Sequence, residues 1–292
     1  MVESLDRILA VTDLSLAGDI AVQEASQRAR QQGSRLGVVH AIPTLDAIRP
    51  LFPHRLADEA VLASQLPLRA ELTLRAQLDS LGVTGDYDLI IEQGTMADVT
   101  LNVVERWKPT MLVVGSPVDG AVGTIGLIRH ATTPVLVART SRASARVVVG
   151  TDFSDPSFPA VRAAAAAAAS IHGGLVLVHA IEVNPIALYG MMLPVSETVS
   201  GDAQGVMRQR LEDVLQRLGV TAQVHVCIGP PGPALLQAAA MYQAGLLVVG
   251  THGRTGVTRF LLGSVAEAVI HHAPCSVLVT RLEGPEADGS TR

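Results

Sequence analysis

The chain has 292 residues, of which 48% are hydrophobic and 17% charged, which is enough for one large or two ordinary domains and excludes a disordered chain. The formal net charge of −5 argues against a nucleic-acid-binding surface. Only two cysteines occur, which favours a cytosolic protein with free thiols. The start of the chain, 1–6, does not resemble a secretion signal, and the most apolar stretch, 161–170, is shorter than the roughly 20 residues of a membrane span. We therefore expect a cytoplasmic protein without membrane contact.

The chain repeats itself. Residues 7–15 (RILAVTDLS) return as 146–154 (RVVVGTDFS), and VHAI at 39–42 returns at 178–181. Further matches follow in the same order: 81–83 with 218–220, 113–115 with 248–250, and 135–137 with 277–279. Ordered matches predict a duplicated domain of ordinary size. The expected organisation is a first copy at 1–140, a linker at 141–145, a second copy at 146–282 and a flexible tail at 283–292.

Each copy alternates short apolar strands with helices. In the second copy the expected strands are 146–150, 175–180, 222–228, 246–250 and 276–281, and the expected helices are 155–171, 206–218, 233–243 and 264–272. This alternation predicts an α/β fold with a five-stranded parallel sheet in each copy and helices on both of its faces. In such sheets ligands bind at the carboxyl ends of the strands where the strand order reverses, here between the first and fourth strands.

A glycine-rich loop follows the fourth strand of the second copy. Gly250, Gly253, Gly263 and Ser264 form the pattern Gly-x2-Gly-x9-Gly-Ser between an apolar run and the start of a helix. Glycines let the backbone approach an anion, and the first free N–H groups of a helix point at it. The loop also contains three cationic donors: His252, Arg254 and Arg259. This context favours a phosphate cradle over ordinary turns.

Asp152 follows the first strand of the same copy. A carboxylate at that position can accept a hydrogen bond from a ribose hydroxyl or an adenine amine. The alternative is that Asp152 caps the amino terminus of the following helix.

The glycine pattern resembles the ATP-binding signature of the universal stress protein family, Gly-x2-Gly-x9-Gly-Ser/Thr. The flanking segments VGTDFS, LVHA and HAPC extend the resemblance, and both copies share features of them. Nearly the whole chain is therefore similar to a tandem universal stress protein with two Rossmann-like, adenine-nucleotide-binding domains. The resemblance implies ATP, ADP or AMP, with or without Mg, in the second copy. The residues it implies are Gly150, Thr151, Asp152, Ala180, Val249, Gly250, Gly253, Gly263, Ser264 and Val265.

The first copy departs from this pattern. Its loop is seven residues shorter, Val118 stands where the second copy has Gly253, and Asp119 adds a negative charge. Gly123 and Thr124 imitate the final pair at the wrong spacing. We expect this copy to bind nucleotide weakly or not at all, although Asp13 persists. Binding of a smaller anion or of another ligand is the alternative.

The remaining histidines and cysteines are expected to be structural. His271, His272 and Cys275 lack the spacing of a zinc site, so no metal ligand is predicted. His40 and His179 are expected to be hydrogen-bonded, and Cys227 to belong to the core.

No catalytic residue is predicted, because there is no nucleophile elbow, P-loop lysine or carboxylate pair. The resemblance implies an ATP-binding stress regulator or sensor with an unknown protein partner. It also implies association through the last strand, either between the two copies as a pseudo-dimer or in a homodimer. The alternatives are a nucleotide-independent scaffold and, below it, a slow ATP hydrolase.

Overall fold

The structure is a computed structural model that describes residues 6–44, 59–116, 122–140, 144–182, 198–251 and 262–281. It contains two compact units, Met1–Arg139 and Thr140–Arg292.

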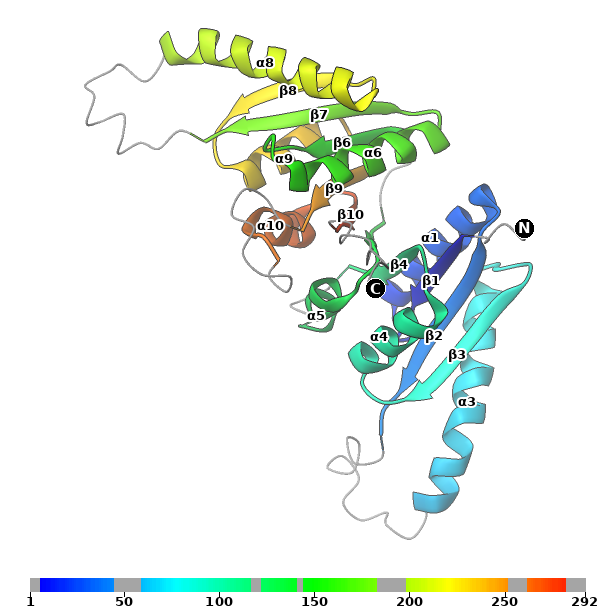
Figure 1. Ribbon diagram of the computed structural model, residues 1–292. Coiled ribbons are helices and arrows are strands. Elements are labelled where there is room, and N and C mark those ends of the chain that lie inside the picture. Colours follow the sequence, from blue (N-terminus) through cyan, green and yellow to red (C-terminus); the bar gives the residue numbers. More distant parts are fainter. Residues whose placement is uncertain are drawn as a thin grey trace, which may run out of the picture. The chain divides into compact units, whose positions relative to one another are not determined.

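Unit 1 is a five-stranded parallel sheet in the order β3-β2-β1-β4-β5. Its strands are β1 (Arg7–Val11), β2 (Arg35–Ile42), β3 (Tyr87–Gln93), β4 (Met111–Gly115) and β5 (Val135–Ala138). Its helices are α1 (Leu16–Gln32), α3 (Glu59–Ser80), α4 (Met96–Trp107) and α5 (Val122–His130) (Figure 1).

Unit 2 repeats this topology with the order β8-β7-β6-β9-β10. Its strands are β6 (Arg146–Gly150), β7 (Gly174–Ile181), β8 (Gln223–Ile228), β9 (Leu246–Gly250) and β10 (Ser276–Thr280). Its helices are the 3-10 turn η3 (Asp155–Ser157), α6 (Phe158–Ser170), α8 (Thr198–Leu218), α9 (Pro231–Met241) and α10 (Ser264–His272). The predicted pair of five-stranded parallel sheets is confirmed.

Helices cover both faces of each sheet. In unit 2 the crossovers through α6 and α8 run from β6 to β7 and then to β8. The crossovers through α9 and α10 run in the opposite direction across the sheet, to β9 and then to β10. Right-handed crossovers therefore place α6 and α8 on one face and α9 and α10 on the other. In agreement, the Arg217 guanidinium of α8 lies over the Phe158 ring of α6, and α9 packs against α10.

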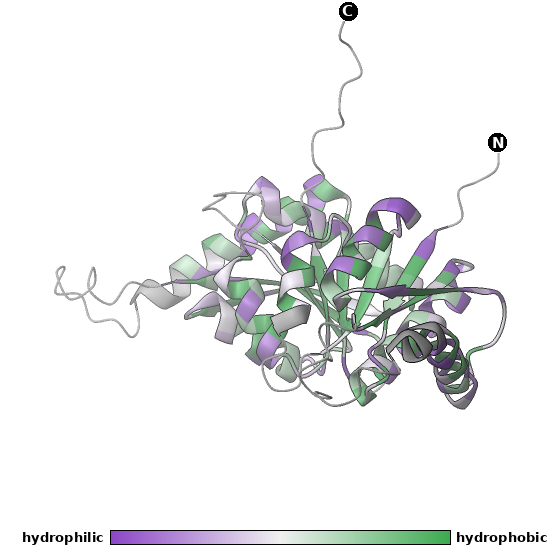
Figure 2. Cartoon of the chain, turned by 90° about the horizontal axis from the view of Figure 1, so that it is seen from below, coloured by the Kyte–Doolittle hydropathy of each residue, from purple (hydrophilic) through white to green (hydrophobic). Residues whose placement is uncertain are grey.

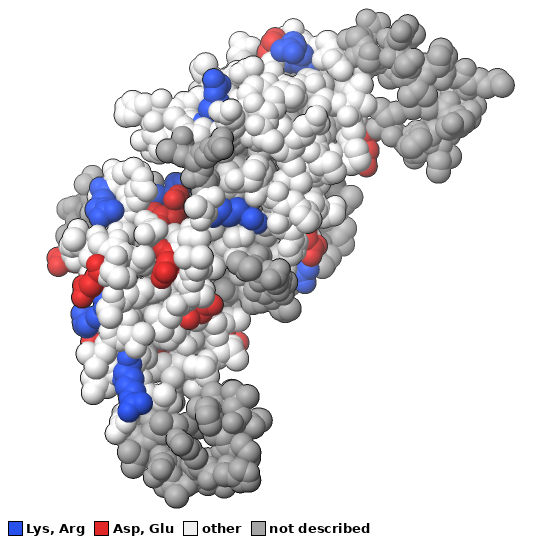
Figure 3. All heavy atoms as spheres, turned by 180° about the vertical axis from the view of Figure 1, so that it is seen from behind, with Lys and Arg blue, Asp and Glu red and all other residues white. Residues whose placement is uncertain are grey.

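The cores are aliphatic, as expected for a chain with few aromatic residues. The inner strands of both units are almost wholly buried, and Figure 2 shows them as hydrophobic. Charged side chains lie on the surface, and on the face in Figure 3 both signs are interspersed among uncharged residues. No helix in the described part of the chain is long and apolar enough to cross a membrane.

Three of the predicted helix starts are wrong. The residues 155–157, predicted as the start of a helix, form the 3-10 turn η3, and α6 begins at Phe158. α8 begins at Thr198 rather than 206, in a polar stretch that carries no apolar periodicity. α9 begins at Pro231 rather than 233, because the first turn of a helix tolerates proline.

Candidate functional site

The predicted site residues lie at the carboxyl edge of the unit 2 sheet, where the strand order reverses. β6 pairs with β7 on one side and β9 on the other. Gly150 ends β6, Gly250 ends β9, and Ala180 lies near the end of β7. Because parallel strands end at the same edge, the sheet brings these segments together. Gly253 and the three loop cations lie outside the described residues.

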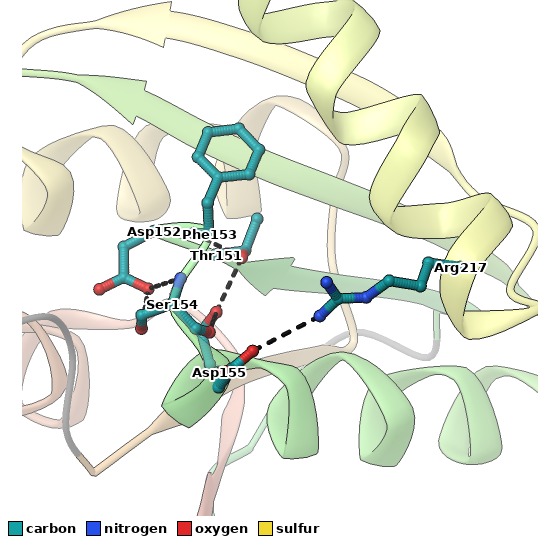
Figure 4. Close-up of polar contacts among 7 residues, drawn as sticks. Thr151, Asp152, Phe153, Ser154, Asp155 and Arg217 are labelled. Atoms are coloured by element: carbon teal, nitrogen blue, oxygen red, sulfur yellow. Dashed lines mark hydrogen bonds and ion pairs between the residues drawn. The ribbon is translucent and has the colours of Figure 1, made fainter.

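The turn after β6 is held by its own side chains (Figure 4). The Asp152 carboxylate accepts hydrogen bonds from the Ser154 N–H at 3.0 Å and the Ser154 hydroxyl at 2.5 Å. The Phe153 N–H donates to the Thr151 hydroxyl oxygen at 3.1 Å. Phe153 has a φ of 66°, in the left-handed region that bulky residues seldom adopt. These hydrogen bonds therefore stabilise a strained turn.

The helix-cap alternative for Asp152 is wrong. Ser154 is the N-cap of η3, and its side chain makes no capping hydrogen bond. Asp152 instead accepts from the residue two positions later, which is an Asx turn. The sequence did contain the signal for this turn, since Thr-Asp-x-Ser occurs in both copies. One carboxylate oxygen of Asp152 is thus engaged locally.

Helix α10 begins directly beside the end of β9. The N-cap Gly263 donates its N–H to the Thr251 carbonyl at 2.9 Å, and its own carbonyl accepts from the Glu267 N–H at 2.9 Å. The N–H groups of Ser264 and Val265 lie in the first turn of α10, where no carbonyl of the helix can accept from them. They are therefore available to bind an anion. Ser264 is exposed and Val265 half-buried.

Glycine at 263 has a steric reason. A Cβ added there would lie 3.2 Å from the Thr251 carbonyl oxygen, which is tighter than an ordinary contact. A larger residue would push α10 away from the end of β9.

Three of the predicted site residues have structural roles. A Cβ on Gly150 would lie 2.8 Å from Leu235 Cδ1, so this glycine lets α9 pack on β6. Val249 is buried in β9. The buried Thr151 hydroxyl lies 2.8 Å from the Ser157 hydroxyl. The predicted residues whose side chains are half-buried or exposed are Asp152, Ala180, Ser264 and Val265.

The histidines at the ends of the second strands are structural, as predicted. The Nδ1 atom of buried His179 lies 2.9 Å from the Thr151 carbonyl oxygen. His40 makes the same contact with Thr12, also at 2.9 Å. Each histidine ties the second strand to the turn that follows the first.

No metal centre is found among the other histidines and cysteines that the structure describes. Cys227 is half-buried on β8 rather than in the core, and its thiol contacts the His179 carbonyl at 3.6 Å. Burial raises the pKa of the Cys227 thiol. Burial, with a smaller effect from Arg208, lowers the pKa of His225 on the same strand. Among the described residues, no group of three or more acidic, histidine or cysteine side chains could hold a metal ion.

The turn after β1 in unit 1 has the same conformation. The Asp13 carboxylate accepts from the Ser15 N–H at 3.0 Å, and Leu14 has a φ of 65°. Here, however, the Ser15 side chain caps a regular α-helix by accepting from the Gly18 N–H at 3.3 Å. Ser157 takes the place of Gly18 in unit 2, where the first turn is η3. A Cβ on Gly18 would lie 2.5 Å from the Thr12 hydroxyl oxygen, so the serine requires a different first turn.

The fold and the edge geometry define a tandem, Rossmann-like α/β protein. The model of the Universal stress protein family matches residues 4–139 and 144–281. The chain therefore belongs to the universal stress protein family and carries two family domains in tandem.

The chain is similar to individual universal stress proteins. A universal stress protein of Mycolicibacterium smegmatis is 27% identical over 289 residues, which cover 94% of this chain and 96% of the relative. The crystal structure of a universal stress protein from Archaeoglobus fulgidus DSM 4304 has a TM-score of 0.68 at 20% identity, covers 94% of this chain and 98% of its own, and shows the shared fold. Another universal stress protein, solved in complex with cAMP, is 31% identical, covers 46% of this chain and 94% of its own, and has a TM-score of 0.33.

Proposed function

We propose that unit 2 binds one adenine nucleotide per chain and that the protein acts as a nucleotide-dependent stress regulator in the cytoplasm. The observation that carries this proposal is the junction of β9 and α10. The Gly263–Thr251 hydrogen bond holds the start of α10 at the end of β9, on the edge that also carries Asp152. The glycine pattern of the intervening loop is intact in the sequence.

Each accessible residue fits a part of the nucleotide. The Asp152 carboxylate suits the adenosine end as an acceptor for ribose or adenine donors. The small side chain of Ala180 leaves room for a base over the end of β7. The N–H groups of Ser264 and Val265 and the Ser264 hydroxyl suit phosphate oxygens. A Mg²⁺ ion would arrive with the phosphates, because the described residues form no metal cluster of their own.

The proposed role is binding rather than turnover. The two polar side chains at this edge, Asp152 and Ser264, are assigned to binding, so we expect ATP hydrolysis to be slow at most. A partner protein would then read whether the site holds nucleotide. A nucleotide-independent scaffold remains the competing proposal.

Calorimetry with ATP, ADP, AMP and cAMP, with and without Mg²⁺, tests the proposal on protein freed of bound nucleotide. We expect one ATP per chain. Asp152→Asn combined with Gly263→Val should weaken binding by about tenfold or more, from the lost charge-assisted hydrogen bond and the displaced helix start. Asparagine retains an oxygen that can accept from Ser154, so the Asx turn survives the change.

The matched control is Asp13→Asn, which makes the same change in the equivalent turn of unit 1. It should leave the affinity and the stoichiometry unchanged. Absence of binding to the wild-type protein, or equal binding by the double variant, would favour the scaffold. Mass spectrometry of ligand released on denaturation identifies the nucleotide that the protein carries from the cell.

A further inference from the structure

Phe153 links the turn after β6 to two other elements. Asp152 and Phe153 point to different sides of the turn, with the Phe153 ring rising on the side of β7 and α8 (Figure 4). The ring centroid lies 4.3 Å from that of His179 on β7. The Arg210 guanidinium of α8 lies over the same ring at 4.8 Å from its centroid. The residue next to Asp152 is therefore held by two elements.

Helix α8 contacts this region at a second point. Arg217 follows Arg210 by two helical turns and so projects from the same side of α8. Its guanidinium lies 4.6 Å from the centroid of the Phe158 ring and 3.5 Å from the Asp155 carboxylate. α8 thus contacts the turn through Arg210 and the start of α6 through Arg217.

Unit 1 holds its equivalent turn in a different way. Leu14 stands in place of Phe153 with the same left-handed backbone. The contact from α3 comes from Gln77, whose side-chain oxygen accepts from the Thr12 hydroxyl at 3.2 Å and whose amide donates to Asp19. The cation–aromatic contact with the turn is described only in unit 2, the unit with the intact glycine pattern.

We propose that Arg210 is a positioning residue for the nucleotide site and that α8 is the element coupled to its occupancy. This inference rests on the proposed nucleotide binding. A phenylalanine in the left-handed region is strained, so it persists only while surrounding contacts favour it. Arg210 supplies one of these contacts and thereby helps to keep the Asp152 backbone at the carboxyl edge. Coupling is reciprocal, so bound nucleotide must in turn stabilise α8 against the turn.

Arg210→Gln tests this role through nucleotide affinity. We expect ATP binding to weaken about two- to fivefold, the range of a cation–aromatic contact at an exposed site. Arg210→Lys keeps a cation but not the planar guanidinium. The ATP affinity of this variant should therefore lie between those of the wild type and Arg210→Gln. Arg208→Gln removes the same charge from the same helix two residues earlier, on a different side of it, and should leave affinity unchanged.

A double-mutant cycle separates this contact from general damage to α8. Leucine is tolerated at the equivalent position in unit 1, so Phe153→Leu should fold. In that background Arg210→Gln should cause no further loss of affinity. Hydrogen exchange gives the second measurement, since ATP should slow the exchange of amides 206–217 in the wild type and in Arg208→Gln but not in Arg210→Gln.

The outcomes separate the two proposals. If the wild type binds no nucleotide, the proposed function fails and this inference fails with it. If the wild type binds and Arg210→Gln binds equally well, only the positioning role is overturned. Equal protection of α8 by ATP in Arg210→Gln and in the wild type would also overturn it.

Discussion

At the residue scale, Asp88 shows how one carboxylate ties together three elements of unit 1. It accepts from Arg35 at the start of β2 at 2.6 Å and from the indole N–H of Trp107 at the end of α4 at 3.1 Å. Arg35, through its hydrogen bond, is the main cause that lowers the pKa of Asp88; desolvation opposes it and Trp107 adds to it. A folded pKa below the unfolded value of about 3.9 means that the charged form favours folding.

This contribution is present above the unfolded pKa and is lost as the pH falls through the folded pKa. Asp88→Asn should therefore lower the urea midpoint of unit 1 at pH 7, and its difference from the wild type should shrink as the pH falls below about 3.9. The effect should be below about 1 kcal/mol, since the pair is partly exposed. Trp107 is the only tryptophan in the chain, so its fluorescence reports on unit 1.

Asp79→Asn serves as the control, because the side chain of Asp79 is exposed at the end of α3. It should not reproduce the pH dependence. If the difference between wild type and Asp88→Asn does not shrink as the pH falls below about 3.9, the charge of Asp88 is not the cause.

At the element scale, one glycine inside α8 and one just beyond its end differ in backbone conformation. A Cβ added at Gly205, inside the helix, or at Gly219, just beyond its end, would meet nothing within 4 Å. Gly219 has a φ of 65°, and the following Val220 N–H donates back to the Leu215 carbonyl at 3.0 Å. This is the hydrogen bond of a Schellman cap, in which glycine is favoured.

Gly205→Ala should therefore stabilise unit 2 by about 0.5–1 kcal/mol, because alanine is the better helix former. Gly219→Ala should destabilise it by about 1 kcal/mol, because the left-handed region disfavours a side chain. Chemical denaturation followed by circular dichroism measures both variants. Changes of the same sign in the two would contradict the assignment of the helix end.

At the scale of the whole molecule, the two copies share a topology but differ around the site. In unit 1 a Cβ on Gly115, at the end of β4, would lie 2.4 Å from the Ala17 carbonyl oxygen. The first turn of α1 thus lies directly against the end of β4. The counterpart of β4 in unit 2 is β9, which leads into the glycine pattern. Unit 1 also has the shorter loop. The shorter loop, with Val118 in place of Gly253, favours binding in unit 2.

Hydrogen exchange with and without ATP should show this asymmetry within a single chain. Amides 151–154 and 262–266 should exchange more slowly with ATP, whereas the equivalent amides 12–15 should not change. The two turns share the Asx hydrogen bond, so each is the reference for the other. Equal protection of both turns would show that unit 1 binds as well.

The sequence by itself determined the duplication and the parallel α/β fold, and it predicted the edge at which the proposed site lies. It also predicted β6, β9 and α10 with the bounds that the structure has. These features follow from repetition, apolar runs and glycine spacing, which are read along neighbouring residues. Gly253 and the loop cations stay predictions, because they lie outside the described residues.

Only the tertiary structure decided how the proposed site is supported. It placed Arg210 over Phe153, 57 positions earlier in the chain, and Leu235 against Gly150. It also turned Asp152 from a possible helix cap into an Asx turn beside a left-handed phenylalanine. Such contacts join residues far apart in the chain, and a strained backbone conformation persists only where those contacts favour it, so local sequence patterns do not encode them.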